Sequence, residues 1–330
     1  LFLLKMENTR SAFKHLICNL LINAHPFVTD RFSHPLSTTI IHKYYLNYAT
    51  IYTEYSDRND INSTNIKNMS EAISLAMRYN NLIIVRWCIN NTDVHHSSTL
   101  YWASMYSILS IVQLLLNKGV TIYAINRALE VASQQGHLKV VQLLLANNAN
   151  VYNINTALNW ASINGHLKVV QFLITYDFTA HTIEYALILA SKYGRLEIVH
   201  LLLKKGVTTS AIDNALQRAS QEGHLEIVKL LLEKGTNVHI QNDNPLRLSS
   251  MFGHLHVVQF LLESGANIHA QDDIAFCLAS QHGHLEIVKL LLDKGANIHA
   301  QDDSPLRLAF IHGHARLVQF LKKIYQPYLL

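Results

Sequence analysis

The sequence is poor in the residues that mark several classes of protein. Its 330 residues include 3 cysteines, 5 prolines and 12 glycines. Cys18, Cys88 and Cys277 are far apart and form no CxxC spacing. They predict reduced thiols and an intracellular location, cytoplasmic or nuclear, rather than a disulfide framework. The scarcity of glycine and proline argues against long disordered linkers.

Strong charge and long apolar runs are also missing. The formal net charge is +4, spread over the whole chain, which predicts no nucleic-acid partner. The apolar run Leu1–Leu4 stops at Lys5, and no run reaches membrane-spanning length, so no membrane association is predicted. No signal-peptide cleavage pattern follows the first residues. Because the chain begins with leucine, we expect that upstream sequence is missing or that Met6 is the start.

A glycine followed by a basic residue recurs through the chain at intervals of 29 or 30 residues. Residues 223–241 match residues 283–301 at fifteen of nineteen positions, which indicates duplication within the gene. The repeat pattern continues more weakly toward the N-terminus, with Ser107 and then Asn80 at the position of the glycine. It predicts about nine units between residues 70 and 325. The glycines of the clearest units are Gly136, Gly165, Gly194, Gly223, Gly253, Gly283 and Gly313.

Each unit has the pattern of two short helices. The first carries small residues four apart, as in Ala215 and Ala219, and ends at the glycine. The second has a wide aliphatic stripe at helical spacing, as in LEIVKLLL at residues 225–232. Neither helix can bury its apolar face alone, so the units must stack into an elongated all-α solenoid. The last unit has Ala315 and Lys322 where the previous unit has leucine, as a terminal unit requires.

The phrase GHLEIVKLLLDKGANIH at residues 283–299 resembles the ankyrin repeat, and the resemblance covers roughly 260 of the 330 residues. Ser304-Pro305-Leu306-Arg307 matches the family's Thr-Pro-Leu-His opening in part. The family repeat has about 33 residues, and the shortfall here lies between Asp303 and Ser304, where the family carries a β-hairpin finger. We therefore expect truncated fingers with little regular strand. This short-repeat style resembles the ankyrin proteins of giant DNA viruses of amoebae.

Residues 1–69 show no repeat and are predicted to be separate from a repeat domain of residues 70–330. Residues 10–24 and 36–55 have helical patterns. Two interpretations stay open for this region: a helical cap on the first repeat, or a separate docking module.

No pattern in the sequence indicates catalysis. There is no GxSxG, HExxH or glycine-rich phosphate loop. Histidines at equivalent positions lie one repeat apart, too far to share a zinc ion with bonds of about 2 Å. We interpret them as helix-start residues bonded to local backbone, and Cys277 as a structural or surface cysteine. No metal, cofactor or small-molecule ligand is expected, and the protein is not expected to be an enzyme.

The two residues before each inter-helix glycine vary from unit to unit, although the frame around them does not. In ankyrin proteins this position lies toward the concave, partner-binding side. Several of these side chains are aromatic, aliphatic or methionine, types enriched in the cores of protein interfaces. The predicted partner-binding residues are Tyr79, Met105, Tyr106, Ile163, Asn164, Lys192, Tyr193, Met251, Phe252, His282, Ile311 and His312.

The function favoured by the sequence is a non-enzymatic scaffold that binds another protein through this variable concave face. Two alternatives remain open. One is a substrate adaptor for a host ubiquitin ligase, with residues 1–69 or an upstream segment as the docking end. The other is a structural or packaged virion protein.

Overall fold

The computed structural model describes residues 82–91, 96–147 and 151–325, together with Ile73 and Met77. These residues belong to one compact unit, Lys67–Leu330. They form helices and turns, with no strand among them, as the truncated fingers predicted. Residues 1–69, and the two helices expected there, lie outside the described residues, so their interpretation stays open.

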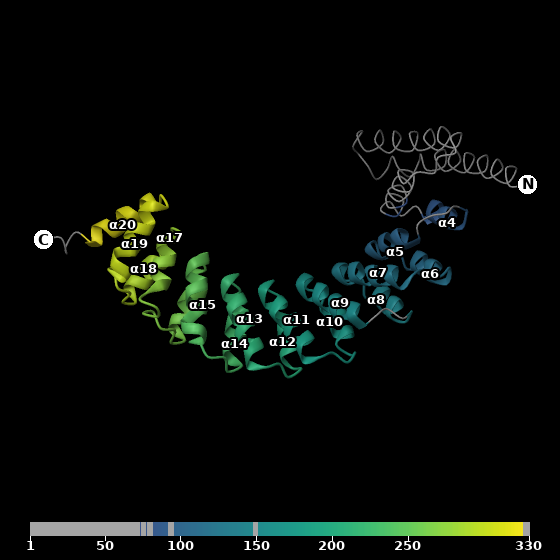
Figure 1. Ribbon diagram of the computed structural model, residues 1–330, viewed down its shortest axis with the longest axis horizontal. Coiled ribbons are helices and arrows are strands. Elements are labelled where there is room, and N and C mark those ends of the chain that lie inside the picture. Colours follow the sequence, from purple (N-terminus) through teal and green to yellow (C-terminus); the bar gives the residue numbers. More distant parts are fainter. Residues whose placement is uncertain (1–72, 74–76, 78–81, 92–95, 148–150, 326–330) are drawn as a thin grey trace, which may run out of the picture. The chain divides into compact units, whose positions relative to one another are not determined.

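Helix pairs follow one another along this unit (Figure 1). Helix α4 (Leu82–Asn91) packs on the second helix of the first complete pair. The complete pairs are α5 (His96–Met105) with α6 (Leu109–Asn117), α7 (Ile122–Gln135) with α8 (Leu138–Leu145), α9 (Val151–Asn164) with α10 (Leu167–Leu173), α11 (Ala180–Lys192) with α12 (Leu196–Leu203), α13 (Thr209–Gln221) with α14 (Leu225–Glu233), α15 (Ile240–Phe252) with α16 (Leu255–Glu263), α17 (Ile274–Gln281) with α18 (Leu285–Asp293), and α19 (Ala300–Ile311) with α20 (Ala315–Tyr325). The all-α stack predicted from the repeat is confirmed.

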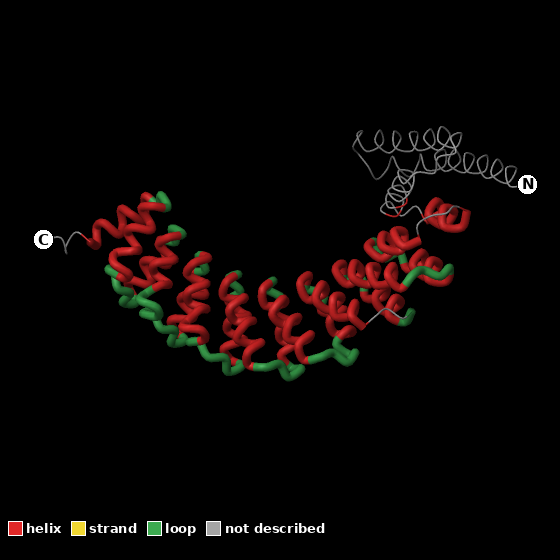
Figure 2. The backbone as a smooth tube through the Cα atoms, in the orientation of Figure 1, coloured by secondary structure: helices red, strands yellow, loops and turns green. Residues whose placement is uncertain are grey.

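Each helix packs on its counterpart in the next pair, so first helices form one layer and second helices another. Within this unit the pairs form a curved row (Figure 2). The short turns inside each pair lie along its inner side, and the longer loops between pairs lie along its outer side. The turn residues of all the pairs therefore share one edge of the row.

The inter-helix turn depends on a glycine with left-handed backbone. Gly223, for example, has φ +79°, a region that costs other L-residues free energy. The next repeat also approaches closely, because a Cβ added at Gly223 would overlap the imidazole ring of His254. Glycine is therefore required at this turn for two reasons: the left-handed backbone and the lack of space for a Cβ beside His254.

The core between pairs is built from small residues on first helices and aliphatic residues on second helices. Ala215, Ala219, Val228 and Leu231 are fully buried. A serine three residues before the turn is also fully buried in each internal repeat, and its hydroxyl makes no hydrogen bond to the described residues. Its small size lets neighbouring first helices approach. These serines are Ser104, Ser133, Ser162, Ser191, Ser220, Ser250 and Ser280.

Two kinds of loop join the pairs. In the 29-residue repeats, Thr121, Thr179 and Thr208 cap the following helix by accepting a hydrogen bond from the backbone N–H three residues later. In the 30-residue repeats, three consecutive residues other than glycine adopt left-handed backbone with φ from 47° to 60°. These left-handed turns are Gln241–Asp243, Gln271–Asp273 and Gln301–Asp303.

The last repeat differs from the internal ones as expected for a terminal unit. Ala315 and Lys322 are exposed on α20. Phe310 occupies the position of the buried serine and is 70% exposed, because no described helix pair follows it. The neighbouring Ile311 is 65% exposed.

Candidate functional site

The structure brings most of the predicted partner-binding residues to one edge. We use the name turn row for the described members, which lie at the inter-helix turns on the inner side of the curve (Figure 2). Tyr79 lies outside the described residues. The turn row comprises Met105, Tyr106, Ile163, Asn164, Lys192, Tyr193, Met251, Phe252, His282, Ile311 and His312.

Members of the turn row differ in how far they are available to a partner. Tyr193 is 43% exposed, Phe252 45% and Ile311 65%, and His282 and His312 are also exposed. The other members are half-buried, so part of each side chain packs within the repeats. The three large exposed side chains are not among the buried core residues, which makes them the strongest candidates for contact with a partner.

A histidine from the next repeat fixes the backbone of the turn row. His137, His224 and His284 donate Nε2–H to the carbonyl oxygens of Met105, Lys192 and Met251, with distances of 2.9–3.0 Å. Arg195 does the same through Nε to Ile163 at 2.8 Å. The sequence interpretation of local bonding was wrong, because the acceptor lies 32 or 33 residues earlier. A carbonyl can only accept, so Nε2 carries the proton.

Burial favours the neutral form of the His284 imidazole. It lowers the pKa of His284, and neighbouring His282, His254 and His314 lower it further, although the hydrogen bond to Met251 opposes this. A neutral imidazole with Nε2–H suits a buried bond to a carbonyl oxygen. These histidines are therefore structural links between repeats.

The exposed sides of the first helices carry aromatic residues that the sequence interpretation missed. Tyr123 is 68% exposed, Tyr185 48% and Trp160 37%. Arg127 lies over the ring of Tyr101, 5.6 Å from its centroid, and a hydrogen bond with Tyr123 raises its pKa. These residues stand five to thirteen positions before the turn glycine. The sequence interpretation rested on only the two residues before each glycine. Comparing these earlier positions between repeats as well would have revealed the aromatic residues.

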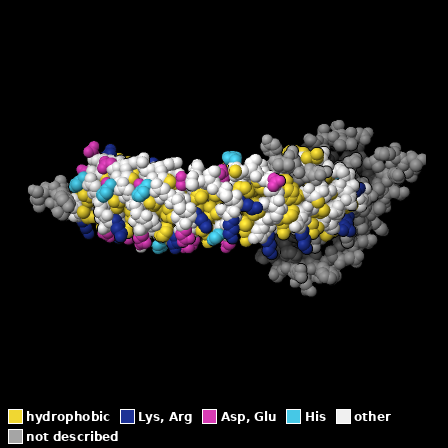
Figure 3. Space-filling view, turned by 90° about the horizontal axis from the view of Figure 1, so that it is seen from below, with side chains coloured by type: hydrophobic (Ala, Val, Ile, Leu, Met, Phe, Trp, Pro, Cys, Tyr) yellow, Lys and Arg dark blue, Asp and Glu magenta, His cyan; other side chains and the backbone are white. Residues whose placement is uncertain are grey.

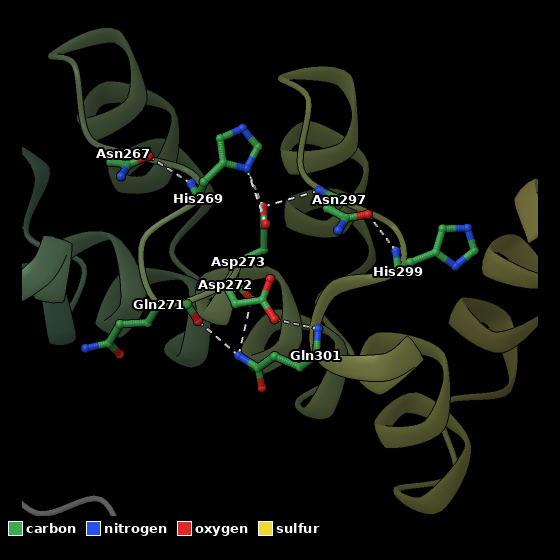
Figure 4. Close-up of polar contacts among 8 residues, drawn as sticks. All are labelled: Asn267, His269, Gln271, Asp272, Asp273, Asn297, His299 and Gln301. Carbon is green, nitrogen blue, oxygen red and sulfur yellow. Dashed lines mark hydrogen bonds and ion pairs between the residues drawn. The ribbon is translucent and has the colours of Figure 1, made fainter.

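A polar network joins the longer loops of the last repeats (Figure 4). The Asp273 carboxylate accepts hydrogen bonds from His269 Nδ1 at 3.1 Å and from the backbone N–H of Asn297 at 3.2 Å. The Asp272 carboxylate accepts from the backbone N–H of Gln301 at 2.9 Å. These hydrogen bonds hold neighbouring loops together.

Seen from the outer side, histidine and acidic side chains gather toward the C-terminal end, and hydrophobic surface is more extensive near the middle (Figure 3).

The described residues contain no group of three or more histidine, cysteine or acidic side chains placed to hold a metal ion. None of the helices in the described part of the chain has the length and apolarity needed to cross a membrane. Cys277 is buried, which decides between the two interpretations that the sequence allowed. Desolvation raises the pKa of its thiol to about 12.

We expect Cys277 to be unreactive in the folded protein, because only the thiolate is nucleophilic. In a variant with Cys18→Ser and Cys88→Ser, a chromogenic disulfide reagent at pH 8 should react with Cys277 at least about tenfold more slowly than with the same protein unfolded in urea. Equal rates in the folded and unfolded protein would contradict the burial of this thiol.

A family model of ankyrin repeats, comprising three copies, matches residues 129–213, 187–272 and 246–327. These matches together cover more than half of the chain, and it belongs to the ankyrin repeat family. No curated protein sequence matches the chain. Ankyrin repeats are generally protein–protein interaction modules.

Proposed function

We propose that this protein is a non-enzymatic scaffold that binds a partner protein through the turn row. The observation that carries this proposal is the pair Tyr193 and Phe252, two large aromatic side chains nearly half exposed at turns whose packing does not require them. Side chains of this type supply much of the binding free energy at protein interfaces. The backbone that presents them is held by hydrogen bonds between repeats, so little ordering is needed on binding.

The proposal predicts that replacing both aromatic residues with alanine weakens partner binding by about tenfold or more. The full chain would be used to capture proteins from a cell extract, and the captured partner's dissociation constant would then be measured with each variant. Tyr176→Ala is the matched control, because Tyr176 is 39% exposed but lies beyond the C-terminal end of α10, away from the inter-helix turns. Loss of binding in Tyr176→Ala, with the double variant unaffected, would overturn the proposal.

The ubiquitin-ligase adaptor and the virion protein remain hypotheses. No contact among the described residues favours either of them, and residues 1–69 lie outside the described part.

A further inference from the structure

Basic side chains gather in three successive repeats at the inner side of the row. Lys139 and Lys168 are the second residues of α8 and α10, and both are exposed. Lys192 ends α11, and Arg195 immediately precedes α12. We call these four residues the basic segment. The only acidic residue in the first turns of α8, α10 and α12 is Glu197.

The basic segment is not neutralised by ion pairs within the described residues. In later repeats, lysines near the start of the second helix are neutralised by ion pairs. In α14 and α18, Glu226 and Glu286 occupy the position of Lys139 and Lys168, and each pairs with a lysine three residues later at 2.8 Å. In α8 and α10 that later position holds glutamine, at Gln142 and Gln171. Lys139 and Lys168 therefore have no ion-pair partner among the described residues, and Glu197 is the one acidic side chain in these first turns.

Helix stability does not explain the two lysines. The first turn of a helix has a positive potential, so an acidic side chain there stabilises the helix and a basic side chain destabilises it. Repeats whose second helix begins with Glu226 or Glu286 follow this rule. Lys139 and Lys168 oppose it, so their placement indicates a role outside the packing of the repeats.

The surroundings of the basic segment suit a peptide rather than a simple anion. The Arg195 Nε–H bond to Ile163 holds the guanidinium between two repeats. Lys192 Nζ lies 5.5 Å from the centroid of the exposed Tyr193 ring. Tyr106, in the α5–α6 repeat before the basic segment, stacks on Trp102 with a centroid separation of 6.0 Å. Cations and apolar side chains therefore both occur along the turns from α5 to α12.

We propose that the basic segment binds an extended, acidic segment of a partner protein. This inference rests on the scaffold function proposed above and specifies the chemistry of the partner. Neighbouring helices lie about 8–10 Å apart, and an extended chain in the polyproline II conformation advances about 3.1 Å per residue with about three residues per turn. One repeat therefore corresponds to about three residues, and every third side chain faces the same side. The favoured ligand therefore has acidic residues at about every third position over roughly ten residues, with aromatic or aliphatic residues between them.

The test uses a fluorescent 12-residue peptide with glutamate at positions 1, 4, 7 and 10 and leucine or tyrosine among the others. Its binding to the full chain would be followed by fluorescence anisotropy. The double variant Lys139→Glu/Lys168→Glu should bind at least about tenfold more weakly, and added salt should weaken binding to the unmodified chain. The melting temperature of the Lys139→Glu/Lys168→Glu variant should be unchanged or higher, because glutamate is favoured in the first turn of a helix. Binding is thus expected to fall without any loss of stability.

The matched control is Lys229→Glu/Lys289→Glu, which changes the net charge by the same amount outside the basic segment. It should change the affinity less than about twofold. Equal weakening by both double variants would overturn the proposal, since the attraction would then be unspecific. A peptide with lysine in place of glutamate should not bind, and equal binding of that peptide would also overturn it. Tighter binding of a 12-nucleotide single-stranded DNA would assign the segment to nucleic acid instead.

Failure of this inference is distinguishable from failure of the proposed function. If Lys139→Glu/Lys168→Glu retains the captured partner and Tyr193→Ala/Phe252→Ala loses it, the turn row binds a partner but the acidic ligand is wrong. If the aromatic variant retains the partner and only the charge-reversed variant loses it, the role proposed for Tyr193 and Phe252 is wrong.

Discussion

Replacing Gly223 with alanine should lower the free energy of unfolding by about 3 kcal/mol or more. Two costs add at this turn. The left-handed backbone costs an alanine about 1–2 kcal/mol. The new Cβ would also displace His254, whose Nε2 donates to the carbonyl oxygen of Gln221 at 2.8 Å, and a half-buried carbonyl left without its partner costs about 1–3 kcal/mol.

Gly313→Ala is the control, because Gly313 occupies the same kind of turn but has no histidine from a following repeat beside it. Gly313 has φ +75°, and a Cβ added to it would meet no atom within 4 Å. It should cost only about 1–2 kcal/mol, the backbone term. Urea denaturation of both variants measures the difference, and hydrogen exchange in α13–α16 would locate the loss at one interface. Equal costs at Gly223 and Gly313 would show that the histidine contact contributes nothing.

Asp273→Ala should destabilise the protein by about 2 kcal/mol. Its carboxylate is 3% exposed and accepts hydrogen bonds from His269 and from the backbone of Asn297 in the next repeat. Hydrogen bonds to a charged acceptor contribute about 1.5–3 kcal/mol, and their loss leaves donors unpaired. The three consecutive left-handed residues of this loop add strain, so these bonds are needed to hold the turn.

Asp303→Ala provides the comparison at the same position of the last repeat. The Asp303 side chain is 57% exposed, and its Oδ1 lies 2.7 Å from Nδ1 of the half-exposed His299. No described repeat follows to donate a backbone N–H to it. The cost should be below about 1 kcal/mol, as for other exposed pairs. If urea denaturation gave the two aspartates equal costs, the proposed link between loops would be wrong.

Much of the fold could be predicted because its determinants lie within one repeat. Small residues four apart, an aliphatic stripe and a glycine every 29 or 30 residues define two helices, a turn and a stack. The position of the turn row followed from the same frame. The terminal character of the last unit could also be read from Ala315 and Lys322, since both positions hold leucine in the previous unit.

The remaining features depend on contacts between repeats, which local patterns do not reveal. The bond from His254 to Gln221 joins residues 33 apart, so the histidine resembles a local helix-start residue in the sequence. The left-handed turn at Gln271–Asp273 contains no glycine and is held by contacts with the following loop. Exposure on the first helices, as at Tyr123, depends on how the helices of neighbouring pairs pack.

Phe310 limits which repeat units can be duplicated without disturbing the packing between helices. Internal repeats place a fully buried serine at its position, against the repeat that follows. A tandem copy of the last unit would have to bury a phenylalanine in that space, and overpacking of this kind costs about 1–3 kcal/mol or more. Copies of internal units carry the serine and have no such barrier. Duplication of an internal unit therefore meets no packing barrier at this position, whereas duplication of the unit that carries Phe310 does.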